Sequence, residues 1–237
     1  MSDHPPSIFT QPYKALVIGA SGAIGHAFHL AFEADPLCSS VHCISRRHSP
    51  DFDLLDQASL AQQAQLCRAW APFHIIVDAT GALTIDGVGP EKSLSSLNHE
   101  SLFKSLEINA VAPALLVRYF APLLQGGPSI YAKLSARVGS ISDNQKGGWY
   151  GYRAAKAALN MLLQTAALEL QRKNPQLRVV ALQPGTVLSP LSSAFVANAP
   201  SVLTPQESVS GMMQALALLP SKSGAHFVDY KGQTIDW

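Results

Sequence analysis

The chain has 237 residues, 47% of them hydrophobic and 14% charged, with a formal net charge of +1. This length fits one α/β domain with a sizeable core, and the charged fraction is low against the usual ~25%, which indicates extensive burial. Because the charge is balanced and no basic stripe occurs, a nucleic-acid partner is not expected. We therefore predict a single soluble domain over residues 1–237.

Cysteine and histidine usage argues against disulfides and metals. Cys38, Cys43 and Cys67 are odd in number and form no CxxC pair, which favours a reducing, cytoplasmic compartment. The eight histidines include no HxxxH or HxH pair, so no metal site is predicted. No apolar run reaches the roughly 18 residues of a membrane span. Residues 1–12 hold three prolines and are expected to form a surface arm, unlike a signal peptide.

The first unit predicted along the chain is a strand over 14–18, a glycine-rich turn over 19–25 and a helix over 27–34. A dinucleotide-binding turn requires this order, because the glycines let backbone N–H groups approach a pyrophosphate at the helix N-terminus. The spacing is GxxGxxG rather than the GxGxxG of two-domain dehydrogenases, and similar turns occur for packing reasons. The turn by itself therefore leaves cofactor binding open.

A second strand is predicted over 41–45, followed by Arg46 and Arg47. In a dinucleotide fold this strand end faces the adenosine ribose, where a carboxylate holds the 2′-hydroxyl and Arg accommodates a 2′-phosphate. Ser45, Arg46 and Arg47 include no carboxylate, so NADP(H) is favoured over NAD(H). The alternative is a solvated basic turn.

The next elements expected are a brief strand over 52–54, a helix over 57–70 and a buried strand over 75–81 that ends in small residues. Asp53 would lie against the adenine. A glycine-rich loop follows over 83–90.

Two helical stretches are predicted between residues 93 and 124, and Asn109 lies inside the second. An Asn among apolar neighbours needs a hydrogen-bond partner. Pro113 lacks the N–H that would bond the Asn109 carbonyl. We therefore expect that carbonyl to be free to hold another group, such as a water.

A strand over 129–135 precedes a long Ala- and Leu-rich helix that runs to about Gln171. Tyr152 and Lys156 are four residues apart and therefore share one face of that helix. A free phenol has a pKa near ~10, and a nearby cation favours phenolate, which suits a general acid at neutral pH. Lys156 is the only lysine with a tyrosine four residues before it, and the alternative is a chance spacing.

The C-terminal part is predicted to hold a strand over 177–182, a helix over 207–219 and a last strand over 225–229. Residues 188–205 are rich in Ser and Pro and are expected to form a mobile substrate lid. Strands that alternate with helices predict one Rossmann-type, doubly wound parallel sheet of about seven strands.

With these pieces in place, the chain resembles the short-chain dehydrogenase/reductase family over essentially its whole length. The resemblance rests on the order and spacing of the glycine turn, the strand end at 78–81, Asn109, the Tyr152/Lys156 pair and residues 184–187. The stretch over 139–153 looks like the branch that holds sniffer-like carbonyl reductases and bacterial C-factor-like proteins.

The resemblance implies specific roles. Tyr152 would protonate the carbonyl oxygen as NADPH delivers hydride, Lys156 would lower the Tyr pKa and hold the nicotinamide ribose, and Asn109 would position a relay water. The expected cofactor contacts are Gly19, Ser21, Gly22, Ile24, Gly25, Ser45, Arg46, Arg47, Asp53, Ala79, Thr80, Gly81, Tyr152, Lys156, Pro184, Gly185 and Val187.

The chain departs from the family pattern in two places. The serine that usually bonds the substrate carbonyl is expected at position 136, which is Ala136, and Ser135 lies one residue earlier. One residue along a strand reverses the side-chain direction, so Ser135 serves only if the strand end twists there. We take Ser135 as the catalytic serine, with Ser140 as a substitute. Gly22 also stands where many NADPH-preferring members carry Arg or Lys, and the usual Asn of the 78–81 motif is absent.

The function expected is NADPH-dependent reduction of an aldehyde or ketone, in the cytoplasm, with a small-molecule substrate and no membrane partner. One alternative is an NADP-binding signalling or scaffold protein with little turnover, and a second is an epimerase or dehydratase on the same fold. The small residues Ala154, Ala157 and Ala158 permit close helix approach and predict a homodimer or homotetramer.

Overall fold

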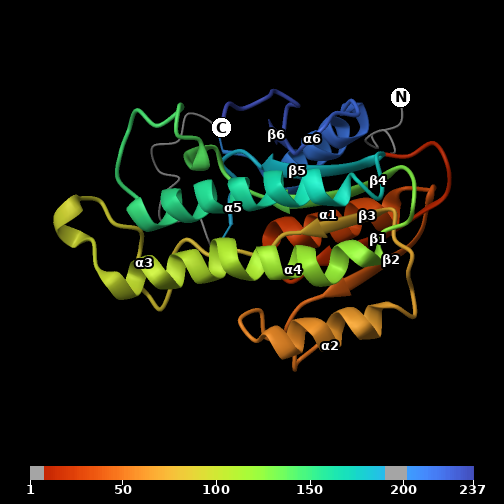
Figure 1. The fold of residues 1–237 in the computed structure, drawn as a ribbon, viewed down its shortest axis with the longest axis horizontal. Coiled ribbons are helices and arrows are strands. Elements are labelled where there is room, and N and C mark those ends of the chain that lie inside the picture. The colour runs from red at the N-terminus through yellow and green to blue at the C-terminus, as the bar shows by residue number, and fades with distance from the viewer. Residues whose placement is uncertain (1–7, 190–201) are drawn as a thin grey trace.

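A computed structural model describes residues 8–189 and 202–237, which form one parallel six-stranded sheet with helices on both faces (Figure 1). The strand order is β2-β1-β3-β4-β5-β6. The strands are β1 (Tyr13–Ile18), β2 (Cys38–Ile44), β3 (Ile75–Asp78), β4 (Ser129–Leu134), β5 (Leu177–Gln183) and β6 (His226–Asp229). The doubly wound α/β architecture is confirmed.

The sheet has six strands rather than about seven, because residues 52–54 do not form a strand. Their backbone donors are used locally. The N–H of Asp53 donates to the hydroxyl of Ser59 at 2.9 Å, and the Asp53 carboxylate accepts from the N–H of Leu55 at 2.9 Å. A side chain that bonds its own backbone two residues on makes a turn, which competes with sheet pairing.

Parallel pairing brings the carboxyl ends of the strands to one edge of the sheet. β1 pairs with β2 on one side and with β3 on the other. The strand order therefore reverses at β1, with β2 on one side and β3 with the later strands on the other, and a crevice forms outside the strand ends where ligands bind in such folds. The glycine turn and the ends of β2 and β3 meet here.

Two hydrophobic cores lie on opposite faces of the sheet. On one face α1 (Ala23–Ala34) and α6 (Pro205–Leu218) cover the odd-numbered side chains of β1, and on the other α2 (Gln57–Cys67), α4 (Ala112–Phe120) and α5 (Tyr150–Leu170) cover the even-numbered ones. In Figure 1, α4 and α5 run side by side in front of the sheet. The long helix predicted to end near Gln171 is confirmed.

The helical stretch between β3 and β4 is broken by a π-helical segment. Its parts are η1 (Leu94–Ser96), α3 (His99–Leu106), η2 (Glu107–Val111), α4 and η3 (Ala121–Leu123). In η2 the N–H of Ala112 donates to the carbonyl of Glu107, five residues earlier. Among the described residues, 99–123 form one helix long and apolar enough to cross a membrane, but half of its apolar window is buried. Such burial is typical of a core helix.

The surface arm and the mobile lid expected from the sequence fall partly outside the described residues. Of the predicted arm, Ile8 is buried and Phe9 packs against the ring of Tyr13 at 5.0 Å, so this part lies on the core. The predicted lid falls largely on 190–201, and its last residues belong to the start of α6, where Thr204 is the N-cap.

Candidate active site

A cleft of about 640 Å³ opens at the carboxyl ends of β1, β2 and β3. It brings together three separate segments that were predicted to bind a cofactor. The predicted residues that line it are Gly19, Ser21, Gly22, Ser45, Arg46, Asp53, Ala79, Thr80 and Gly81. Pro50, Asp51, Phe52, Leu54, Leu55, Ala82 and Ile108 also line it and were not singled out from the sequence.

The glycine turn forms one wall of this cleft. Gly19 has a φ of +86°, which favours glycine, and its N–H donates to the carbonyl of Ile44 at 2.8 Å. A Cβ on Gly25 would collide with the carbonyl of Gly19, so the third glycine allows the helix to pack against the turn. α1 begins at Ala23 without a side-chain cap and without an acidic residue in its first turn. Its N-terminal N–H groups can therefore bind a phosphate.

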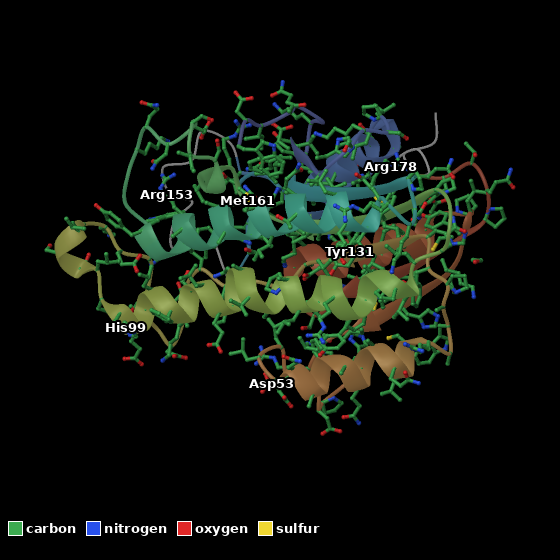
Figure 2. All side chains as sticks on the ribbon, viewed as in Figure 1. Asp53, His99, Tyr131, Arg153, Met161 and Arg178 are labelled. Carbon is green, nitrogen blue, oxygen red and sulfur yellow. The ribbon has the colours of Figure 1, made fainter. Side chains whose placement is uncertain are left out.

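The end of β2 contributes Ser45 and Arg46. Ser45 is buried, and its hydroxyl bonds Nδ1 of His48 at 2.7 Å, whereas Arg46 is exposed and lines the cleft. Arg47 is exposed and does not line it. Figure 2 places Asp53 beside the start of α2, and Asp53 also lines the cleft.

Tyr152 and Lys156 lie one turn apart on α5, as their spacing predicted. The Lys156 ammonium is 5.6 Å from the centre of the Tyr152 ring. Lys156 is buried, and its Nζ donates to the carbonyl of Leu134 at 3.1 Å. Tyr152 is half-buried, and its hydroxyl makes no hydrogen bond to the described residues.

Burial shifts both pKa values. Loss of hydration raises the pKa of Tyr152 to about 12, so the phenol is protonated at neutral pH. Burial, aided by the nearby charge of Lys133, lowers the pKa of Lys156 to about 7. In the protein without cofactor, burial therefore opposes the lowering of the tyrosine pKa that we expected from the neighbouring cation.

Asn109 lies at the centre of η2 and is fully buried. Its side chain donates to the carbonyl of Ala82 at 2.9 Å and accepts from the N–H of Ala82 at 3.0 Å. A Cβ on Gly81 would lie 3.1 Å from Asn109 Oδ1 and 3.7 Å from Lys156 Nζ. Asn109, Lys156 and the end of the cleft therefore meet at Gly81.

The Ser135 side chain is occupied elsewhere. Its hydroxyl donates to Oδ1 of Asn160, one turn beyond Lys156 on α5, at 2.7 Å. Ser140 is also buried and bonds Ser142 at 3.2 Å. Neither hydroxyl bonds Tyr152, and the catalytic role of Ser135 stays a prediction.

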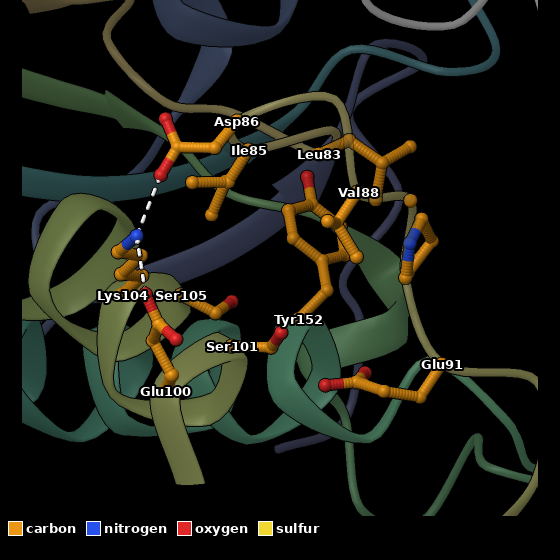
Figure 3. A pocket seen from close by; sticks show the side chains of 12 residues that line it. Leu83, Ile85, Asp86, Val88, Glu91, Glu100, Ser101, Lys104, Ser105 and Tyr152 are labelled. Atoms are coloured by element: carbon orange, nitrogen blue, oxygen red, sulfur yellow. Dashed lines mark hydrogen bonds and ion pairs between the residues drawn. The ribbon is translucent and has the colours of Figure 1, made fainter. Parts of the chain in front are cut away.

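A second pocket, of about 150 Å³, lies beside Tyr152 between α3 and the 83–91 loop (Figure 3). Figure 3 shows the Tyr152 ring beside Leu83 and Val88, and Lys104 farther away between Asp86 and Glu100, at 2.7 and 2.9 Å. The wall nearest the phenol is therefore apolar.

The start of α5 is tied to this pocket by Glu91. Its carboxylate accepts from the N–H of Gly151 at 3.0 Å, and a Cβ on Gly151 would lie 3.0 Å from it. Arg153 donates to the carbonyl of Gly148 at 3.0 Å. These contacts fix the backbone on both sides of Tyr152.

The remaining predicted cofactor residues follow β5 or belong to α1, and they lie outside the cleft lining. The carbonyl of Pro184 accepts from the Ser208 hydroxyl at 2.6 Å. Gly185 has a φ of +80°, and Val187 pairs with Leu203 in an isolated bridge. Ile24 and Gly25 lie in the first turn of α1 behind the glycine turn.

The sequence reasoning missed a buried ion pair next to this site. Lys133 Nζ lies 2.9 Å from Asp78 Oδ1, and both side chains are 0% exposed. Lys133 was predicted only as part of the strand over 129–135. Its charge inside such a strand was the available signal, because an unpaired lysine is seldom fully buried. Among the described residues, no group of three His, Cys, Asp or Glu is placed to hold a metal ion.

Comparison with known proteins agrees with this geometry. The model of the short chain dehydrogenase family matches residues 13–199. The 1-hydroxy-2-glutathionyl-2-methyl-3-butene dehydrogenase of Rhodococcus sp. (strain AD45) is 28% identical over 79% of each chain. The C-signal protein of Myxococcus xanthus is 29% identical over 61% of this chain and 84% of its own length.

Solved structures share the fold. The NADPH-bound carbonyl reductase from chicken fatty liver has a TM-score of 0.83 at 21% identity, covering 99% of this chain and 97% of its own. The carbonyl reductase Sniffer of D. melanogaster has a TM-score of 0.80 at 20% identity, covering 96% of this chain and all of its own.

Proposed function

Because this chain belongs to the short-chain dehydrogenase family and is thus an oxidoreductase, we propose that it uses NADPH to reduce an aldehyde or ketone carbonyl to an alcohol. One observation carries the proposal. Asn109 and Lys156 converge on Gly81 at the end of the cleft, and Tyr152 lies one helical turn from Lys156. This arrangement joins a dinucleotide-sized cleft to a proton donor.

The cleft fits NADP(H). The tight approach of Gly25 to Gly19 leaves backbone N–H groups at the start of α1 for the pyrophosphate. Arg46 at the end of β2 supplies a guanidinium for a 2′-phosphate. The relative from chicken fatty liver, named as NADPH-bound, has the same fold and supports this choice of cofactor.

The residues of this chain would divide the proton chemistry between them. Tyr152 is protonated at neutral pH, since its pKa is raised to about 12, and it would donate to the substrate oxygen. Bound NADPH supplies the hydride. Lys156, with a pKa lowered to about 7, holds or releases a proton near neutrality and would restore the phenol. Asn109 keeps Gly81 and Ala82 in place beside it.

The pocket beside Tyr152 suits a substrate that is apolar next to its carbonyl group. Leu83 and Val88 lie beside the Tyr152 ring, and Lys104 forms ion pairs with Asp86 and Glu100 farther away (Figure 3). The predicted lid at 188–205, which is also uncharged, would cover such a substrate.

The test is NADPH consumption, with NADH in parallel, against a panel of aldehydes, ketones and quinones. We expect turnover with NADPH well above that with NADH. Tyr152→Phe should lower kcat by about 10³-fold while NADPH binding, followed by fluorescence, is retained. Unchanged turnover in Tyr152→Phe contradicts the proposal, as does NADPH binding without turnover on any substrate, which would favour a signalling role.

We also propose a homodimer or homotetramer formed through α5. Its outer side carries the exposed residues Ala154, Met161 and Leu168, and the neighbouring α3–α4 stretch exposes Phe103 and Val111. Small and apolar residues together allow close helix packing. A light-scattering mass equal to one chain would contradict this.

The three free cysteines agree with a cytoplasmic location.

A further inference from the structure

Lys133 and Asp78 lie directly opposite each other at the ends of β4 and β3. Both side chains are fully buried, and Lys133 Nζ lies 2.9 Å from Asp78 Oδ1. Nζ also donates to the Thr80 carbonyl at 2.6 Å and to the Thr80 hydroxyl at 3.0 Å. A buried ion pair is often no more stabilising than apolar residues of the same size, so its presence calls for another explanation.

The pair holds the turn that follows β3. Asp78 Oδ1 accepts from the Thr80 N–H at 2.9 Å and from its hydroxyl at 2.6 Å. The turn wraps around the Lys133 ammonium. On its outer side, a Cβ on Gly19 would lie 3.0 Å from the Ala79 backbone, and Gly81 approaches Lys156. The turn therefore lies between the glycine wall of the cleft and the catalytic lysine.

The same lysine also acts on the charge of Lys156. The residue after Lys133 is Leu134, whose carbonyl accepts the Lys156 ammonium. Burial is the largest cause of the lowered pKa of Lys156. The charge of Lys133 is the second and lowers it further, whereas the charge of Asp78 raises it. Tyr152 is the other titratable group that faces this ammonium.

The remaining charged groups on the elements that pack against α5 are engaged elsewhere or exposed. They are Lys104 with Asp86 and Glu100, Arg137 with Asp143 and Asp229, Arg178 with two backbone carbonyls, Glu91 with the Gly151 N–H, and the exposed His99, Glu107 and Arg118. Lys133 and Asp78 are thus the charges that matter for Lys156.

We propose that Lys133 and Asp78 are positioning residues of the active site: the ion pair holds the Thr80–Gly81 turn between the cofactor cleft and Lys156, so that the Lys133 and Lys156 ammonium groups approach the same turn. The inference rests on the proposed function only in assigning Lys156 to catalysis. A lysine that releases its proton near neutral pH can return a proton to Tyr152 in each turnover.

The experiment uses the full chain without cofactor, labelled with ¹³C at the lysine Cε. The Lys156 signal, identified by its loss in Lys156→Met, is followed against pH. In the native protein the midpoint should lie near pH 7. In Lys133→Met the repulsive charge is lost while the side-chain volume is kept, and the midpoint should rise by about 1 pH unit.

Two further variants keep the test decisive. Lys133→Met/Asp78→Asn leaves no unpaired buried carboxylate and should also raise the midpoint, by no more than the single variant. Lys173→Met removes an exposed lysine beyond the end of α5 and should leave it unchanged. A midpoint that stays at its native value in both the single and the double variant overturns the inference.

A binding measurement tests the turn. NADPH affinity, measured by fluorescence, should weaken about 10-fold in both Lys133 variants, because the turn loses its charged hydrogen-bond donor. Unchanged affinity in both would overturn the positioning of the turn. If the native protein itself does not bind NADPH, the proposed function fails, and the titration still decides the effect of Lys133 on Lys156.

Discussion

The buried ammonium of Lys156 should make the stability of the cofactor-free protein depend on pH. Its pKa falls from 10.5 to about 7 on folding. Between these values the unfolded chain binds more protons than the folded one, so stability rises as the pH rises from 7 towards 10.5. Because one pKa unit corresponds to about 1.4 kcal/mol, the full destabilisation below pH 7 amounts to about 5 kcal/mol.

Other groups limit the window in which this effect can be measured. The thiols of Cys38, Cys43 and Cys67 have pKa values raised from 9.0 to about 11. Above pH 9 the unfolded chain loses these protons first, so stability falls as the pH rises further. Burial lowers the pKa of His226 from 6.5 to about 4, so stability falls as the pH falls below 6.5. Between pH 7 and 9 these groups contribute little, and Lys156 adds about 2 kcal/mol.

The assay is urea unfolding of the cofactor-free protein at several pH values between 7 and 9. Lys156→Met should abolish the rise of about 2 kcal/mol that Lys156 contributes. The pKa of Lys133 is also lowered by burial, so the comparison of variant with native protein isolates Lys156. Lys173→Met is the matched control and should keep the native slope. The same slope in the native protein and in Lys156→Met would refute the burial argument.

Three further substitutions test separate parts of the site. Ser135→Ala removes the 2.7 Å bond to Asn160 and should cost about 1–3 kcal/mol in urea unfolding; if Ser135 is the catalytic serine, kcat should also fall about a hundredfold, and kcat within a few-fold of native would contradict that role. Gly25→Ala should abolish NADPH binding in a fluorescence titration, since its Cβ would collide with Gly19, and native affinity would contradict that packing. Arg46→Ala should weaken NADPH about 10-fold and leave NADH unchanged, and equal losses for both would remove Arg46 from the 2′-phosphate site.

The sequence was sufficient for the features that depend on local spacing. A helix places residues four apart on one face, so the Tyr152/Lys156 pair could be recognised without coordinates. The strand, glycine turn and helix at 14–34 likewise follow from short-range steric rules, because only glycine permits the φ of Gly19 and the close approach at Gly25. Alternation of strands and helices predicted the doubly wound sheet.

Tertiary structure decided what depends on partners distant in the chain. The sequence could not show that Lys133 faces Asp78, because the two are 55 residues apart and meet only through strand pairing. The partner of Ser135, Asn160, is on another element, and Asp53 bonds its own neighbours instead of pairing in a strand. Burial, which sets the proton affinity of Lys156, is a property of the packed molecule: it depends on which groups surround the ammonium and exclude water from it.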